Sequence, residues 1–350
     1  MKQHIFLAVA AVVVLGLTKG VLSFPAEQRE TDTIWPIPQK NGSILWMTEE
    51  QALTEADDSP LEKKQTFDKI KFFLYTEANP TEPIEIIKDD LKSLVRSKFD
   101  FKNPTRFMIH GWMGGYDSGW SIREALLMNG TNKQYNFISV DWSVYSTSAL
   151  YIPSQRKCSK AGKIVAEFID WMHDQAKLSF DTLAVYGSSL GAHVAGFAGK
   201  NVKRGKIHTI VGLDPAMPLF QYKNTKKRLA STDAVYVETI QTNGGVLGFN
   251  EPIGKAAFYP NGGHYQPGCD VNDIFCSHIR AIEYFAEALS QGERNSFVAL
   301  ECSDLESMEK AACGKRLPLV RLGDPNNAKK AKGIYYLLTH SQAPYSILKF

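Results

Sequence analysis

The sequence predicts an α/β fold, with a mostly parallel central sheet and helices on both of its faces. Between about residues 70 and 340, short apolar segments alternate with segments of helical periodicity, which is typical of parallel strands joined by crossover helices. The turn Gly-Ser-Ser-Leu-Gly at 187–191 follows one such apolar segment and opens a helical one. A chain of 350 residues, 44% of them hydrophobic, can also bury a core of this size without help from disulfides.

Strands are expected where short apolar or β-branched runs lie between turn residues. In chain order these are 70–76, 105–110, 137–142, 182–187, 207–213, 234–242 and 333–340. Helices are expected where apolar residues recur every three or four positions. In chain order these are 118–129, 161–176, 190–200 and 277–291. Every one of these helices lies between two strands, as the fold class requires.

The N-terminal residues differ in character from the rest of the chain. Lys2 is followed by the apolar run 5–17 and by small residues up to Ser23, a pattern that predicts a signal peptide of residues 1–23 and a secreted protein. A membrane anchor is the alternative, but the run is shorter than the roughly 20 residues that a span needs. Residues 24–66 are polar and contain prolines, so we expect a loosely structured N-terminal extension, or a pro-segment, before one domain at 67–350.

Charge and cysteine content narrow the function classes. The net charge is +3, and loss of Lys2 and Lys19 with the signal leaves 38 basic against 37 acidic residues, so no nucleic acid partner is expected. In a secreted chain the close cysteine pairs 269–276 and 302–313 are predicted to form disulfides. Cys158 is then left free and partly buried. Asn41 and Asn129 begin N-glycosylation sequons.

Ser189 is the candidate nucleophile. It lies between the strand 182–187 and a helix that starts at Leu190, with Gly187 and Gly191 on either side. Small residues at these two positions allow strand and helix to pass closely around a strained, exposed serine, the nucleophile elbow of the α/β-hydrolase fold. The alternative is a serine that only caps the helix. Ser188 is the weaker candidate, because the glycines are not centred on it.

Chain order selects the partners of this serine, since in this fold the acid and then the histidine follow it. Asp214 comes directly after the strand 207–213, and the carboxyl ends of parallel strands carry the chemistry of α/β sheets. Three histidines follow: His264, His278 and His340. His278 is favoured because it begins a helix just after Cys276, and His264 is the second choice.

A nucleophilic serine also needs amide donors for the oxyanion. The Leu190 amide supplies one of them. The turn after the strand 105–110 offers the amide of Trp112 as the second, because Gly111 permits a tight turn there. His110 is expected to be a structural histidine of the core.

Together these residues resemble the pancreatic lipase family of secreted serine esterases. The matching stretches run in order over nearly the whole mature chain: IHGW, VDW, GSSLGAHVAGFAG, GLDPAMP, FYPNGG, QPGC and CSHIRA. The resemblance implies an α/β-hydrolase fold, a triad of Ser189, Asp214 and His278, and an oxyanion hole of the Trp112 and Leu190 amides.

Departures from the family pattern are equally informative. Ser188 stands where the family usually has a histidine. The chain has no room for the C-terminal β-sandwich of the larger members, so no colipase partner is expected. Thr225 and Ala230 stand where some members have acidic calcium ligands, so no metal is expected. No cofactor is expected either.

The predicted lid sets the expected substrate. Only six residues separate Cys269 from Cys276, too few for a helical flap, and this resembles the short-lid branch of phospholipase A1 and insect lipases. We therefore expect cleavage of phospholipid or acylglycerol esters at a lipid surface. The alternatives are a catalytically inactive lipid-binding protein of the yolk type and an esterase of small soluble esters. The sequence gives no oligomeric state.

Overall fold

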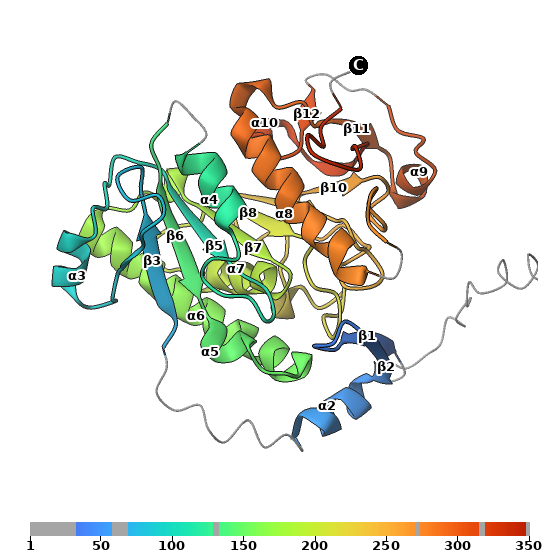
Figure 1. The fold of residues 1–350 in the computed structure, drawn as a ribbon, viewed down its shortest axis with the longest axis horizontal. Helices are drawn as coiled ribbons and strands as arrows, with labels where there is room; N and C mark the ends of the chain where they lie inside the picture. Colours follow the sequence, from blue (N-terminus) through green and yellow to red (C-terminus); the bar gives the residue numbers. More distant parts are fainter. Residues whose placement is uncertain (1–32, 58–68, 129–132, 271–272, 315–318, 348–350) are drawn as a thin grey trace, which may run out of the picture.

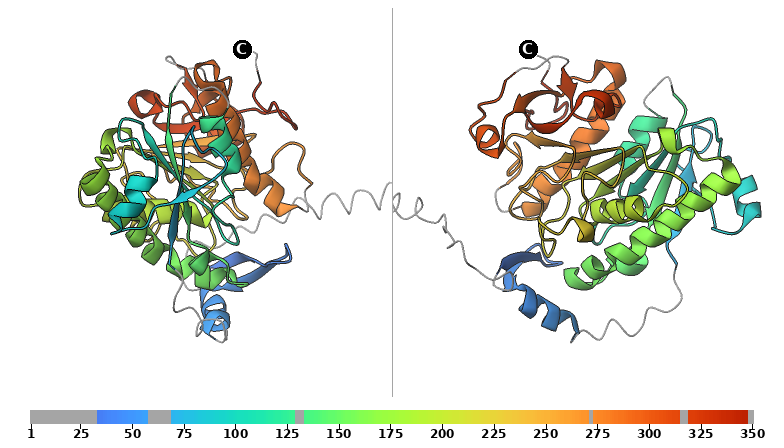
Figure 2. Two further views of the ribbon diagram at one scale, coloured as in Figure 1. Left: turned by 60° about the vertical axis from the view of Figure 1, so that its left-hand side comes forward. Right: turned by 180° about the vertical axis from the view of Figure 1, so that it is seen from behind.

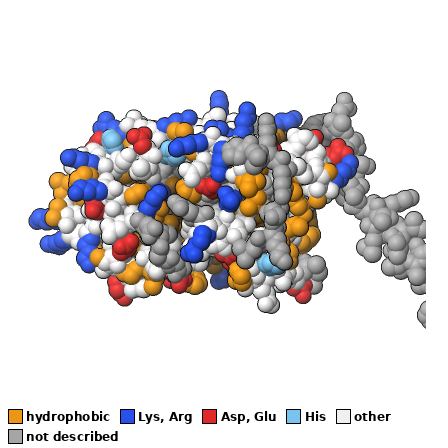
Figure 3. All heavy atoms as spheres, turned by 90° about the horizontal axis from the view of Figure 1, so that it is seen from above, with side chains coloured by type: hydrophobic (Ala, Val, Ile, Leu, Met, Phe, Trp, Pro, Cys, Tyr) orange, Lys and Arg blue, Asp and Glu red, His pale blue; other side chains and the backbone are white. Residues whose placement is uncertain are grey.

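The structure is a computed structural model that describes residues 33–57, 69–128, 133–270, 273–314 and 319–347. The predicted signal peptide and Asn129 lie outside these residues. Seen from above (Figure 3), lysine and arginine side chains are interspersed with acidic and apolar ones. Within the described ranges, no helix has the length and apolar character needed to cross a membrane.

A large twisted sheet is the centre of the molecule (Figure 1). Its strand order in the described residues is β12 (Val320–Arg321), β11 (Val298–Cys302), β13 (Gly333–Leu337), β10 (Ala256–Pro260), β9 (Tyr236–Ile240), β8 (Thr209–Leu213), β7 (Ala184–Ser188), β5 (Thr105–Ile109), β6 (Asn136–Asp141), β3 (Lys71–Tyr75) and β4 (Ile84–Glu85). The strands from β13 to β6 in this order are parallel, and antiparallel pairs occur only at the two edges. The predicted mostly parallel sheet is confirmed.

Helices cover both faces of the sheet (Figure 2). On one face α6 (Tyr151–Ala176) packs against α7 (Leu190–Asn201), and on the other α4 (Trp120–Leu127) packs against α8 (Ile274–Gln291). Neighbouring strand residues point to opposite sides, so Val185 belongs to the core under α6 and α7, whereas Tyr186 belongs to the core under α4 and α8. The shorter helices are α3 (Leu91–Arg96), α5 (Ser143–Ser146), α9 (Leu305–Glu309) and α10 (Asn327–Lys330).

The helices and strands differ from the sequence prediction in one boundary and in the presence of additional strands. Helix α6 begins at Tyr151 instead of residue 161, because Pro153 lies in the first helical turn, where its missing N–H is not needed. Strands β10 and β11 are present where no strand was expected. β10 is short and flanked by turns, and only its pairing with β9 and β13 identifies it. The described C-terminal residues 319–347 complete the sheet and form no β-sandwich.

The N-terminal segment is ordered where the sequence predicted loose structure. β1 (Ile34–Pro38) and β2 (Ile44–Thr48) form an antiparallel hairpin, and α2 (Glu49–Asp57) follows and packs against α6. Trp35 and Ile37 are buried in the same core as Tyr151 at the start of α6. The prediction of a loose extension is therefore wrong for residues 34–57, because these apolar side chains are buried by a helix more than a hundred positions along the chain.

Candidate active site

Ser189 occupies a sharp turn between β7 and α7. Its backbone angles are φ 55° and ψ −122°, a region that non-glycine residues rarely adopt and that often marks a functional site. A Cβ on Gly191 would lie 2.2 Å from the Ile109 carbonyl oxygen, and one on Gly187 would lie 2.3 Å from that of Gly191. Both glycines are therefore required for the turn, as their spacing predicted.

Asp214 and His278 meet beside this turn. Asp214 follows β8, is fully buried and has a positive φ of 42°. Its Oδ1 accepts hydrogen bonds from the amides of Thr242 at 2.7 Å and Asn243 at 3.1 Å. Its Oδ2 lies 2.5 Å from Nδ1 of His278, which α8 carries. With Nδ1 donating to the carboxylate, the Nε2 of His278 is the nitrogen that can accept a proton.

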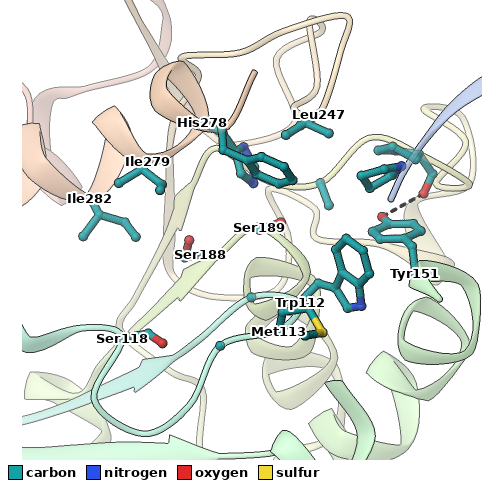
Figure 4. A pocket seen from close by; sticks show the side chains of 16 residues that line it. Trp112, Met113, Ser118, Tyr151, Ser188, Ser189, Leu247, His278, Ile279 and Ile282 are labelled. Atoms are coloured by element: carbon teal, nitrogen blue, oxygen red, sulfur yellow. Dashed lines mark hydrogen bonds between the residues drawn. The ribbon is translucent and has the colours of Figure 1, made fainter. Parts of the chain in front are cut away.

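Ser189 and His278 line one cleft of about 270 Å³. Both side chains are labelled at this cleft in Figure 4. Most of the wall is apolar, and the residues that form it are Pro38, Gly111, Trp112, Met113, Gly114, Ser118, Tyr151, Ser188, Ser189, Ala216, Pro218, Leu247, Phe275, His278, Ile279 and Ile282. An apolar cleft with a few convergent polar groups is typical of a small-molecule binding site.

The turn at Gly111 lies directly against the serine. A Cβ on Gly111 would be 2.9 Å from the Cβ of Ser189, so the chain can pass here only with glycine. The next residue, Trp112, lines the cleft, and its indole N–H donates to the Ser148 carbonyl at 2.9 Å. Leu190 is the first residue of α7. The two residues predicted to supply oxyanion amides thus both lie beside Ser189.

The other histidines considered for the site are placed elsewhere. His264 Nδ1 contacts the Gly244 carbonyl at 2.9 Å, and His340 lies beyond the end of β13. His110 is buried against Trp142, whose indole donates to the His110 carbonyl at 2.7 Å, so its role is structural, as expected. Burial alone would raise the pKa of Asp141, but hydrogen bonds from His110 and Ser143 outweigh it and lower this pKa to about 2.

His193 has a structural role that sequence reasoning missed. It is fully buried in α7, where its Nε2 contacts the Ala216 carbonyl at 2.6 Å and its Nδ1 accepts from the Leu229 amide at 3.0 Å. Phe220 stacks on the ring at 3.7 Å. Burial lowers the pKa of His193 to about 3, so a neutral imidazole holds the segment that includes Ala216 against the cleft. No local pattern in the sequence marks this contact.

A buried ion pair occupies the loop where some family members hold calcium. The Lys200 ammonium contacts Asp233, and the other oxygen of this carboxylate accepts from the Ala230 amide at 2.9 Å. In the described part of the chain, no group of three or more His, Cys, Asp or Glu side chains could hold a metal ion. Lys200 thus provides a cationic partner for the buried carboxylate of Asp233.

Both predicted disulfides are confirmed. Cys269 is bonded to Cys276, and Cys302 to Cys313. Cys158 is free, as predicted, but it is completely buried within α6, which corrects the expected partial exposure. Its Sγ lies 3.8 Å from the Leu190 carbonyl, and burial raises the pKa of this thiol, so it is an unreactive core residue.

The Lipase family model matches residues 46–345. The chain belongs to the Lipase family. The resemblance drawn from its motifs is therefore confirmed, and the turns around Ser189 and Asp214 are those of a lipase-family sheet.

Several proteins are similar to this lipase-family chain. Lipoprotein lipase of Gallus gallus is 33% identical over 333 residues, and the match covers 85% of this chain and 66% of that protein. Lipoprotein lipase of Homo sapiens is 32% identical over 309 residues, which is 80% of this chain and 64% of that protein. The matched region thus spans less than two thirds of each relative. Among solved structures, an esterase (EaEST) from Exiguobacterium antarcticum matches 43% of this chain and 44% of its own at 18% identity, with a TM-score of 0.24.

Proposed function

We propose that this chain is a secreted serine ester hydrolase that cleaves carboxylic esters of glycerolipids. The contact between His278 and the fully buried Asp214, beside a serine held in a strained turn, is the observation that carries the proposal. A nucleophile, a base oriented by a carboxylate, and neighbouring backbone amides are the parts that acyl transfer requires. Membership of the Lipase family supports it.

In the proposed mechanism, His278 Nε2 takes the proton of Ser189 as the serine oxygen attacks the ester carbonyl. Asp214 stabilises the imidazolium, and the Trp112 and Leu190 amides stabilise the oxyanion. His278 then gives the proton to the leaving alcohol, and the acyl group stays on Ser189. Water, deprotonated by the same histidine, releases the fatty acid and restores the serine.

The cleft favours a substrate with one long acyl chain and a polar remainder. Its wall is apolar around Leu247 and Ile282, whereas Ser118 and Ser188 contribute hydroxyl groups. Only six residues separate Cys269 from Cys276, a span too short for a helical flap over the cleft. We therefore propose sn-1 cleavage of phospholipid in preference to long-chain triacylglycerol, without a sharp rise in rate where the substrate aggregates. The lipase name of the relatives favours acylglycerol as the second candidate.

The test is to measure turnover of Ser189→Ala on dispersed phospholipid, a triacylglycerol emulsion and a soluble short-chain ester. We expect a loss of roughly 10⁴-fold or more on all three substrates, with an almost unchanged melting temperature. Ser188→Ala is the matched control, since it removes the neighbouring hydroxyl of the same cleft and should retain most of the activity.

Near-normal turnover of Ser189→Ala would disprove the proposed nucleophile. A strong preference of the unmodified protein for emulsified triacylglycerol, or a steep rise at the aggregation point, would contradict the proposed substrate and leave the nucleophile in place.

A further inference from the structure

The N-terminal hairpin lies at the proposed catalytic cleft. Pro38, the last residue of β1, is part of the cleft wall. A Cβ on Gly42, in the hairpin turn, would lie 4.0 Å from the ring of Phe275, which lines the cleft from α8. Gln39 forms an isolated bridge with Leu150 just before α6. The hairpin thus connects two sides of the cleft, α6 and the start of α8.

The two faces of this hairpin have different surroundings. Trp35 and Ile37 of β1 are buried in the main core and anchor the hairpin. The hairpin register places Ile34 and Trp46 on the same face as the cleft residue Pro38, because alternate residues of a strand and directly opposed residues of paired strands share a face. On this face Ile34 is 52% exposed and Trp46 is 64% exposed, and neither strand contains a charged residue. Two large exposed apolar side chains on one face of an anchored, uncharged hairpin indicate an interaction site.

The apolar surface continues around the mouth of the cleft. Met113 and Ile279 both line the cleft and are themselves exposed, one from the turn after β5 and the other from α8. Tryptophan favours the boundary between water and lipid, because its ring is apolar and its N–H remains able to reach water. A surface of this composition beside an ester-cleaving cleft fits the surface of aggregated lipid better than a charged partner.

We propose that the hairpin of residues 34–48 is a lipid-docking element of the cleft, in which Ile34 and Trp46 insert into the substrate surface while Pro38 forms part of the wall that receives the acyl chain. This inference rests on the proposed function, because it names the surface from which that cleft takes its substrate. Insertion removes the two side chains from water, and the anchored hairpin holds them at a fixed distance from Ser189.

Vesicle binding tests the proposal directly. The inactive Ser189→Ala protein, which leaves the lipid intact, is mixed with phosphatidylcholine vesicles and sedimented, alone and with Ile34→Ser or Trp46→Ser added. Each added substitution is expected to weaken binding about tenfold, as loss of one inserted apolar side chain implies. Val95→Ser is the matched control. Val95 is 84% exposed on α3, which lies on the far side of the molecule from the hairpin (Figures 1 and 2), and its loss should leave binding unchanged.

Turnover of a soluble short-chain ester by the active protein separates this inference from the proposed function. Ile34→Ser and Trp46→Ser should leave that turnover, and the melting temperature, unchanged while hydrolysis of vesicle lipid falls. Unchanged vesicle binding would overturn the inference, as would an equal loss in Val95→Ser or loss of a protein dimer in Trp46→Ser without loss of vesicle binding. If no ester is cleaved by the unmodified protein but vesicle binding still depends on Trp46, the proposed function fails and the docking role stands.

Discussion

The cleft has two walls of different construction. The inner wall consists of the turns after β5, β7 and β8, at Gly111, Ser189 and Asp214. Here the backbone adopts strained angles, glycines leave no space for a Cβ, and the buried carboxylate has a partner for each oxygen. The outer wall includes Pro38 of the N-terminal hairpin and Phe275, which lies next to the disulfide-bonded Cys276. Both side chains are apolar, and the hairpin beside Pro38 is partly exposed.

This difference separates two tasks within one site. The inner wall must hold reacting groups within a few tenths of an ångström, so the sheet and its buried hydrogen bonds fix it. The outer wall must contact a substrate of variable shape, for which apolar side chains on anchored but exposed segments suffice. Damage to the inner wall should therefore reduce stability and chemistry together, whereas damage to the outer wall should affect the handling of lipid alone.

The largest effect on stability and turnover is expected from Gly191→Ala, which adds a methyl group within the inner wall. The added methyl would overlap the carbonyl oxygens of Ile109 and His110, both backbone atoms of β5 and its following turn. We expect a loss of about 4 kcal/mol or more in the free energy of unfolding, together with loss of turnover. Gly115→Ala, where a Cβ meets nothing within 4 Å, is the control. Equal tolerance of both substitutions in denaturant unfolding would show that the inner wall is not tightly packed.

An intermediate effect on the free energy of unfolding is expected when the pH is lowered, because His193 lies buried behind the inner wall. Its folded pKa of about 3 lies below the unfolded value of about 6.5. The unfolded chain therefore binds the proton more readily between these values, and stability present above pH 6.5 falls as the pH drops towards 3. At pH 4 the loss is about 3 kcal/mol. His193→Gln should remove this part of the pH dependence of unfolding.

Glu238 provides the control of opposite sign. Burial raises its pKa to about 7 although Tyr236, Asn327 and Gly323 donate hydrogen bonds to it. The contribution of Glu238 to the stability of the fold is fully present below its unfolded-state pKa of about 4.3, and it is lost as the pH rises through 7. Glu238→Gln should thus increase the loss of stability at acid pH, whereas His193→Gln should reduce it. The assignment fails if both variants keep the pH profile of the parent.

The smallest effect is expected in the outer wall. Replacing Cys269 and Cys276 by serine removes a disulfide with a sequence separation of 7, worth about 2 kcal/mol in the loop-closure treatment. Turnover of a soluble ester should persist, because Asp273 still caps α8 through the amides of Phe275 and Cys276, and the helix keeps His278 in place. Replacing Cys302 and Cys313 should cost a similar amount of stability without altering lipid hydrolysis. A large loss of soluble-ester turnover in the first variant alone would mean that the outer wall also positions His278.

The sequence by itself determined the parallel sheet, the turn at Ser189, the choice of Asp214 and His278, and both disulfides. Each of these depends on a local pattern: apolar runs between turns, two glycines around a serine at a strand–helix junction, an aspartate at a strand end, and cysteines close in the chain. Such patterns are readable because strand, turn and helix preferences act over a few residues.

Only the tertiary structure decided the parts that depend on distant partners. The hairpin of residues 34–48 is stable because Trp35 and Ile37 are buried in the main core, and its polar, proline-containing surroundings give no local sign of this. The role of His193 likewise comes from Ala216 and Leu229, which other loops bring to it. Burial energy belongs to contacts between segments and not to either segment alone, so the contribution of the hairpin to the cleft wall could not be predicted from its own sequence.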